Sequence, residues 1–277
     1  MQRINERKGA RARALGAAAA LAALTALPGL SRAEPMSLRY DIIVGGMKAM
    51  KMTYDGDIGP KSYKAHVVIK PTGGLLSLFI KKSFDLGGSG AVSASGARPS
   101  VFYMTIKKRK KLKKGTVRWK GGKLAWERTP TPSAGYRAGI FRAIGAGAPD
   151  PLSLVIGLSG RKASQSCRGT RRVFDAHDVY DLRLSLRGEK RISSAIYHGP
   201  AQLCRMDFAP VAGYSDKKRR KIRKHPWVFN VWLAPVNAGS AGKLMAPVAA
   251  FGSLDGHDFK AVLKRAVLAG RPLLASR

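Results

Sequence analysis

Alternation of apolar and polar residues is the sequence feature that most limits how this chain folds. In Asp181–Arg187 every second residue is Leu, and Trp227, Phe229, Val231 and Leu233 repeat the same spacing. Successive side chains of a β-strand point to opposite faces, so a period of two indicates strands with one buried face. The chain is therefore predicted to be mainly β.

Short runs with strand character follow one another from residue 38 onward. Turns between them are predicted at Gly45-Gly46, Gly121-Gly122, Gly188-Glu189 and Asp255-Gly256. The other predicted strands are Leu38–Val44, Met47–Tyr54, Ser62–Lys70, Phe84–Ser95, Val101–Lys111, Thr116–Lys120, Arg171–Asp175, Ile192–His198 and Ala201–Pro210. Such a series favours an antiparallel arrangement, and we expect one large, strongly curved sheet or open barrel.

Two segments depart from the period of two. Gly74–Lys82 carries apolar residues at helical spacing, and Asp150-Pro151 places an N-cap and a first-turn Pro before the apolar run Leu152–Leu158. We expect one or two short helices that plug or cap the sheet. Phe259–Val267 has helical spacing but follows a hairpin-type turn at Asp255-Gly256, so helix and strand both remain open.

The first 33 residues have the pattern of a secretory signal. Basic residues up to Arg13 precede the apolar stretch Ala14–Leu27, which is shorter than the roughly 20 residues that cross a bilayer as a helix. The small residues Ser31 and Ala33 predict cleavage after Ala33. We expect a signal peptide over residues 1–33 and a single exported domain over residues 34–277.

The charge of the chain is strongly positive. It has 51 Lys+Arg and 16 Asp+Glu, a formal net charge of +35, yet 45% of its residues are hydrophobic. That hydrophobic content argues against a disordered basic tail. Two octamers, Lys107–Lys114 and Lys217–Lys224, each hold seven basic residues and one aliphatic residue at the sixth place, Leu112 or Ile222.

These two basic runs are the candidate binding residues. They are Lys107, Lys108, Arg109, Lys110, Lys111, Lys113, Lys114, Lys217, Lys218, Arg219, Arg220, Lys221, Arg223 and Lys224. Export separates the chain from nucleic acid, so none is expected as a partner. We expect adhesion to an anionic membrane or lipopolysaccharide surface, with a lipid or a lipoprotein as further candidate ligands. The alternative is solvated side chains that keep a hairpin from pairing with another copy.

Evidence for catalysis is weak in this sequence. Asp175, His177, Asp178 and Asp181 form the densest cluster of metal-ligand types, but they lack the spacing of a zinc or calcium site and are typical turn residues. Gly157–Gly160 misses the nucleophile-elbow pattern by one position. We predict no metal, no cofactor and no enzymatic activity. An enzyme acting on envelope polysaccharide or lipid, and a structural interaction scaffold, are the alternatives.

The chain has two cysteines, Cys167 and Cys204. An oxidising compartment favours a disulfide between them, which would stabilise the fold by roughly 4 kcal/mol. The alternative is a reactive thiol activated by the neighbouring Arg168 or Arg205.

Several short motifs occur in an order that resembles a known family. They are Asp150-Pro151-Leu152-Ser153, Val173-Phe174-Asp175, Tyr180-Asp181-Leu182, Tyr197-His198-Gly199-Pro200-Ala201 followed by Cys204, Gly213-Tyr214 and Val231-Trp232-Leu233-Ala234-Pro235. Residues 38–130 match more loosely, through Thr72-Gly73-Gly74-Leu75 and Arg98-Pro99. The chain resembles a bacterial exported family catalogued as domain of unknown function 3108.

The resemblance implies a periplasmic protein with a strongly curved antiparallel sheet, similar to the open barrels of lipoprotein carriers. It also implies that Cys167 bonds to Cys204 and that Tyr197–Cys204 is a core strand. No catalytic residue is implied. The dense basic runs depart from the family, so anion binding is expected of this chain in particular.

The expected function is non-enzymatic binding of an anionic or amphiphilic envelope component through the curved sheet and the basic surface. A carrier needs an apolar cavity with a basic rim, whereas an enzyme needs titratable groups that converge in a cleft. A scaffold needs neither and is favoured by a solid interior.

Overall fold

The described part of the chain is built mostly from β-strands. The computed structural model describes residues 34–73, 81–121, 123–145, 147–160, 165, 167–194, 196–237 and 242–272. Contacts divide the chain into Met1–Arg32 and Ala33–Arg277, and every described residue belongs to the second unit. The predicted signal peptide lies outside the described residues, as does most of the predicted helix Gly74–Lys82.

Fourteen strands of the described residues form one antiparallel sheet. They are β1 (Glu34–Val44), β2 (Met47–Ile58), β3 (Ser62–Pro71), β4 (Lys82–Ser93), β5 (Gly96–Lys108), β6 (Lys111–Lys120), β7 (Lys123–Thr129), β8 (Arg168–Phe174), β9 (Val179–Ser193), β10 (His198–Ala212), β11 (Val228–Asn237), β12 (Lys243–Leu254), β13 (His257–Leu268) and β14 (Arg271–Pro272). The predicted mainly-β class and the single large antiparallel sheet are confirmed.

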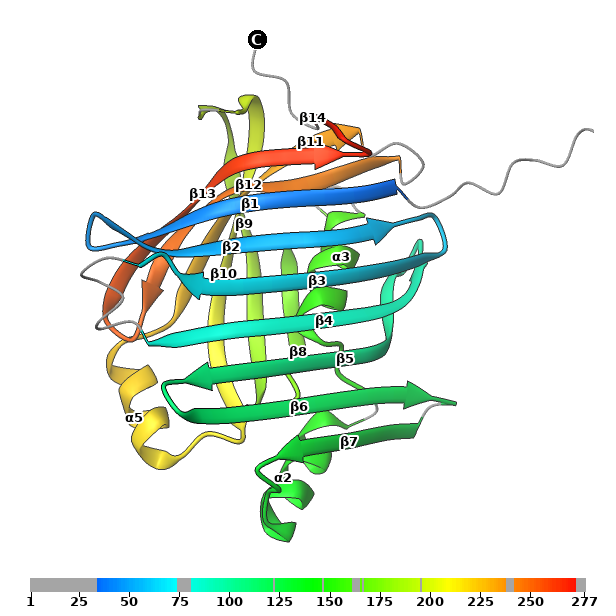
Figure 1. Cartoon of the computed structure of the whole chain (residues 1–277), viewed down its shortest axis with the longest axis vertical. Helices are drawn as coiled ribbons and strands as arrows, with labels where there is room; N and C mark the ends of the chain where they lie inside the picture. The colour runs from blue at the N-terminus through cyan, green and yellow to red at the C-terminus, as the bar shows by residue number, and fades with distance from the viewer. Residues whose placement is uncertain are drawn as a thin grey trace, which may run out of the picture. The chain divides into compact units, whose positions relative to one another are not determined.

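Strand order follows chain order with one exception. The order is β7-β6-β5-β4-β3-β2-β1-β13-β12-β11-β10-β9-β8, with β14 beside β13. The exception is β1, which pairs with β13 from Met36–Leu268 to Val44–Phe259. Two meanders, β1–β7 and β8–β13, are therefore joined along one pair of strands. The sheet curves so strongly that β1–β6 cross in front of β8–β10 (Figure 1).

Within the described part of the chain the sheet does not close, because β7 and β8 end the series without pairing with each other. Side chains bridge this seam instead. The Trp126 indole Nε1 on β7 donates a hydrogen bond to the Ala176 carbonyl, 2.9 Å away, in the β8–β9 turn. The same turn lies so close to β6 that a Cβ atom added to Gly115 would be 2.6 Å from the Ala176 oxygen. Glycine at position 115 therefore permits the two edges to meet.

Three helices occur among the described residues. They are α2 (Ala134–Ile144), α3 (Pro151–Ser159) and α5 (Asp216–Lys224). The prediction over residues 150–158 is confirmed as α3: the Asp150 carboxylate accepts hydrogen bonds from the backbone N–H groups of Leu152 and Ser153 at 2.9 and 3.0 Å, and Pro151 occupies the first turn. Helices α2 and α5 were not predicted. None of the three is long and apolar enough to cross a membrane.

Helix α3 fills the space between the two halves of the curved sheet. It contacts β4 and β5 on one side and β8 and β12 on the other. Its Leu152 and Ile156 belong to the main hydrophobic cluster with Phe102 and Val117, and the Ser153 hydroxyl lies 2.5 Å from that of Tyr63 on β3. Helix α3 is thus a described element that plugs the sheet; the predicted segment from Leu75 lies outside the described residues.

A second, smaller cluster contains the disulfide. Cys167 and Cys204 are bonded, with their Cα atoms 5.6 Å apart, and both are fully buried beside Leu184 and Leu233. The predicted pairing is therefore confirmed and the alternative of a reactive thiol is wrong. The segment Tyr197–Cys204, expected to be a core strand, contributes most of its length to β10.

Four predictions of local structure need correction or completion. The predicted strand Ile192–His198 is not one strand, because β9 ends at Ser193 and β10 begins at His198. Gly188-Glu189 is not a turn but lies inside β9, where Gly188 has a φ of 132° and the register with β10 shifts at Leu203/Cys204. The C-terminal segment is a strand, β13. Strands β7 and β12 were missed, since β7 is only seven residues long and β12 is rich in Ala and carries a Pro.

Candidate functional site: the basic end of the sheet

The first basic run forms the tip of a hairpin. Strand β5 ends at Lys108, and Lys111 begins β6 after a two-residue turn in which Arg109 has a φ of 54°. All eight residues of Lys107–Lys114 are exposed. Strand β7 pairs with β6 only from Lys114 onward, so the tip of the hairpin projects beyond β7.

The second basic run is helical. Ser215 is the N-cap of α5 and accepts a hydrogen bond from the Lys218 N–H, and the cationic side chains of the last turn face the negative end of the helix dipole. Ile222 is buried at 4% exposure and anchors the helix. The Arg219 guanidinium donates to three backbone carbonyls at the end of β10 and in the following connection. This arginine is thus part of the fold as well as of the charged surface.

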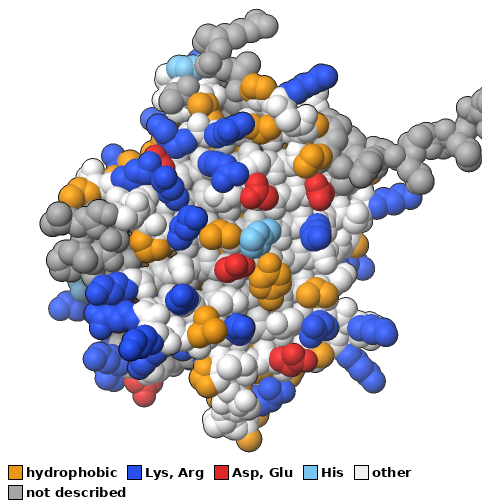
Figure 2. All heavy atoms as spheres, viewed as in Figure 1, with side chains coloured by type: hydrophobic (Ala, Val, Ile, Leu, Met, Phe, Trp, Pro, Cys, Tyr) orange, Lys and Arg blue, Asp and Glu red, His pale blue; other side chains and the backbone are white. Residues whose placement is uncertain are grey.

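The two runs converge on Lys82, the first residue of β4. Lys82 pairs with Lys108 in the β4–β5 register, and its ammonium group lies 4.6 Å from the centre of the Phe84 ring. The pKa of Lys82 is lowered by the loss of surrounding water, and next by the positive charges of Lys218, Lys108 and Lys113. Both runs therefore act on one side chain. Figures 1 and 2 place the β5–β6 turn and α5 at the same end, where Lys and Arg side chains gather.

An acidic residue and an indole fix the orientation of α5 at this end. Asp255, in the β12–β13 turn, accepts hydrogen bonds from Lys218 Nζ and from the Trp227 Nε1, each at 3.0 Å. Lys221 Nζ lies 3.3 Å from the same carboxylate, and Lys218 Nζ is 4.3 Å from the Trp227 ring centre. Partial burial would raise the pKa of Asp255, but the hydrogen bonds from Lys218 and Trp227 lower it below its ordinary value.

We call this surface the basic end: Lys82, the hairpin run Lys107–Lys114 and the helix run Lys217–Lys224. All fourteen predicted binding residues belong to it. What the sequence did not reveal is that residues 110 positions apart share one end, that Lys82 joins them, and that Asp255 and Trp227 hold the helix. The Ser215-Asp216 pair before the second run was a capping signal that predicts the helix.

The Asp/His cluster forms the β8–β9 turn, as predicted. The Asp175 carboxylate accepts hydrogen bonds from the His177 and Asp178 N–H groups at 2.9 and 2.7 Å, which is an Asx-type turn. Asp181 lies outside this turn, on β9, where it forms a two-point ion pair with Arg172 on β8. Among the described residues no group of three His, Cys, Asp or Glu side chains is arranged to hold a metal ion.

The environment of the turn shifts its titrating groups. Burial raises the pKa of Asp175, and the neighbouring Asp178 carboxylate adds to this effect. Burial also lowers the pKa of His177 to about 4, assisted by the positive charge of Arg128. The Arg128 guanidinium stacks 4.7 Å from the Tyr136 ring centre. No local pattern in the sequence indicates that Arg128 and Tyr136 complete this cluster across the seam.

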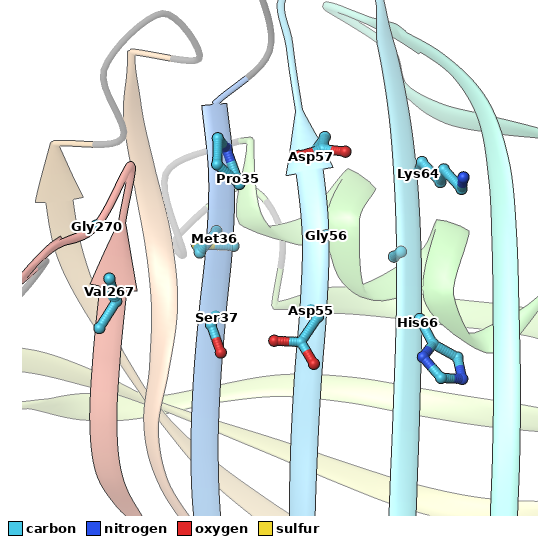
Figure 3. A pocket seen from close by; sticks show the side chains of 11 residues that line it. Pro35, Met36, Ser37, Asp55, Gly56, Asp57, Lys64, His66, Val267 and Gly270 are labelled. Atoms are coloured by element: carbon cyan, nitrogen blue, oxygen red, sulfur yellow. The ribbon is translucent and has the colours of Figure 1, made fainter.

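Depressions elsewhere on the molecule are open. One of about 380 Å³ lies over β1–β3 and is lined by Asp55, Asp57 and His66, among others; Figure 3 shows these side chains spread along neighbouring strands. Asp57 pairs with Lys64 near the β2–β3 turn, at the opposite end of the strands from the basic end. A second depression of about 750 Å³ is lined by Arg205, Phe251 and Lys260. In the first depression Ser37 pairs with Asp55, and Asp55 pairs with His66, across β1–β3. The His66 imidazole hydrogen-bonds to Asp85 on β4.

One family model matches residues 39–256, and its description is protein of unknown function (DUF3108). The match covers most of the chain and includes every motif quoted above from Asp150 to Pro235. No curated protein and no solved structure matches the chain significantly.

Proposed function

We propose that this chain, a member of the DUF3108 family, is a non-enzymatic envelope protein that binds an anionic component of the cell envelope through its basic end. The supporting observation is that both basic runs lie at one end of the sheet (Figure 1): the hairpin run lies beside Lys82 in the β4–β5 register, and Asp255 holds the helix run. Fourteen cations from two distant segments, with Lys82 between them, concentrate positive potential on one surface. Such a surface attracts anionic lipid or polymer, with each cation near an anionic surface contributing about 1 kcal/mol.

Edge protection alone accounts poorly for this arrangement. The part of β6 that has no pairing with β7 is limited to Lys111–Lys113. Solvated lysines there would protect only a short length of unpaired strand edge. The helix run guards no edge, because α5 is not part of the sheet. Its cations nevertheless share the end with the hairpin.

An internal lipid carrier and an enzyme are less well supported. The space between the sheet halves is occupied by α3 and its apolar contacts, where a carrier would need room for an acyl chain. His177 is only 3% exposed, and Asp175 is held in the seam by backbone hydrogen bonds. A substrate would reach this cluster only if the seam opened.

The test removes charge while preserving contacts. One variant carries Lys107→Gln, Lys110→Gln, Lys111→Gln and Lys114→Gln, and a second carries Lys217→Gln, Arg220→Gln and Lys224→Gln; Lys218, Arg219 and Lys221 stay because they hold the fold. Each variant should weaken binding to immobilised polyphosphate and to phosphatidylglycerol vesicles by roughly tenfold or more at low salt, and the salt dependence should become shallower.

The control replaces four exposed lysines at the opposite strand ends: Lys61→Gln, Lys64→Gln, Lys120→Gln and Lys123→Gln. It removes as much charge as the hairpin variant, so it measures the effect of net charge alone. Equal losses in the control and in the basic-end variants would contradict the proposal, as would wild-type protein that binds neither probe.

A further inference from the structure

The basic end also carries exposed apolar side chains at hairpin tips. Met47 follows the β1–β2 turn and is 56% exposed, Leu112 lies in the hairpin run and is 45% exposed, and Leu254 precedes the β12–β13 turn and is 40% exposed. They are among the most exposed large hydrophobic residues in the described part of the chain. Singly exposed apolar residues are ordinary on protein surfaces, but these three share one end.

Pairing and contacts place the three tips together with the cations. Strand β1 pairs with β13 up to Val44–Phe259, so the β1–β2 and β12–β13 turns are neighbours. Leu254 precedes Asp255, which binds Lys218 and Lys221 of α5. Figure 1 shows the β1–β2 and β5–β6 turns on the same side of the molecule as α5.

Each apolar tip is flanked by positive charge. Lys48 follows Met47 and is ion-paired with Asp41 at 2.7 Å. Lys111 and Lys113 enclose Leu112. Lys218 and Lys221 of the helix run bind Asp255, the residue after Leu254. A soluble polyanion interacts with the cations alone and leaves the apolar groups in water. The headgroup region of a bilayer accommodates both kinds of group, because lysine side chains reach the phosphates while apolar side chains enter the acyl boundary.

We infer that the basic end is a docking surface for an anionic phospholipid bilayer, with Met47, Leu112 and Leu254 inserting between the headgroups. This inference rests on the proposed function and names the anionic component as a membrane. The cations supply long-range attraction, which salt screens, and the apolar tips supply a contribution that salt does not screen.

The test compares a membrane with a polymer of the same charge. The triple variant Met47→Ser, Leu112→Ser, Leu254→Ser keeps every cation. Its retention on immobilised polyphosphate should equal that of wild type, which also shows that the basic end is still folded. Its binding to vesicles of phosphatidylglycerol and phosphatidylethanolamine at 0.5 M salt should be weaker by about tenfold or more.

A matched control is Val155→Ser on α3, since Val155 is 45% exposed, as Leu112 is. Val155→Ser should leave vesicle binding unchanged, whereas Leu112→Ser alone should weaken it measurably. Vesicle binding by the triple variant equal to that of wild type overturns the inference and leaves the proposed function standing. Equal losses on vesicles and on polyphosphate overturn it too. Wild type that binds neither probe refutes the proposed function itself.

Discussion

Lys107–Lys114 and Lys217–Lys224 each place one aliphatic residue at the sixth position of a basic octamer, yet Leu112 is 45% exposed and Ile222 is 4% exposed. The flanking residues differ. The first run continues the strand pattern of β5 into a hairpin, whereas Ser215 and Asp216 begin a helix before the second. The same composition thus forms a projecting tip in one place and an anchored helix in the other. Charge density predicts neither structure.

Removal of the disulfide should produce the largest difference in local stability between the two basic runs. Cys204 lies in β10, the strand that leads to α5, and its bond to Cys167 closes a loop of 37 residues. The double variant Cys167→Ala, Cys204→Ala should lower the free energy of unfolding by about 4 kcal/mol. Native-state hydrogen exchange should accelerate in β10 and α5 more than in β5 and β6. Equal acceleration of hydrogen exchange in both regions would contradict the prediction that the disulfide stabilises the helix run more than the hairpin run.

The next effect concerns the two aliphatic residues. Ile222→Ala should lower the free energy of unfolding by about 2–4 kcal/mol because it leaves a cavity under α5. Leu112→Ala should change it by less than about 0.5 kcal/mol because that side chain is already in water. Urea unfolding of both variants measures the difference. Helix propensity does not confuse the result, since Ala favours helix more than Ile does. Similar losses would mean that Leu112 has a packing partner.

The smallest effect is pH-dependent and belongs to the helix run alone. Hydrogen bonds from Lys218 and Trp227 outweigh partial burial and lower the pKa of Asp255. Its contribution to stability is therefore present above the ordinary pKa of about 4 and is lost as the pH falls through the lower value in the folded state. Asp255→Asn should destabilise the protein by less than about 1 kcal/mol at pH 7.

The difference between Asp255→Asn and wild type should shrink as the pH falls below the ordinary pKa of about 4, as thermal unfolding across the pH range would show. Lys111→Gln is the matched control on the hairpin run, where the described residues form no ion pair. It should show no comparable pH dependence. If Asp255→Asn lowers the free energy of unfolding equally at every pH, the loss arises from packing and not from the charge of Asp255.

The fold was predictable where apolar and polar side chains alternate or a capping motif is present. It was not predictable where tertiary packing determines the local structure. Leu182, Leu184 and Leu186 marked β9 correctly, and Asp150-Pro151 marked the start of α3. Strand β12 was not predicted, because its buried positions include the small residue Ala246 and because Pro247 interrupts the strand pattern. Gly188 was misassigned because a glycine within a strand, at a shift of register, has the same local sequence as a hairpin turn.

The candidate site was predictable in its members but not in its geometry. Both basic runs are plain in the sequence, and their convergence depends on the β4–β5 register that sets Lys82 beside Lys108 and on the β12–β13 turn that brings Asp255 to Lys218. These are long-range relations that no local pattern encodes. Met47 and Leu254 adjoin the predicted turns Gly45-Gly46 and Asp255-Gly256, which was a signal of exposure, but that they share one end follows only from the pairing of β1 with β13.

The pairing of β1 with β13 also determines when the molecule is able to finish folding. Every other pairing joins successive strands, so each meander assembles from contacts that are local in the chain. Met36 pairs with Leu268, and a chain emerging from its N-terminus first lacks this partner until more than 200 further residues have been made. Contacts of such separation are slow to form. For that interval β1 keeps a bare edge, which is the kind of surface that recruits foreign strands and aggregates.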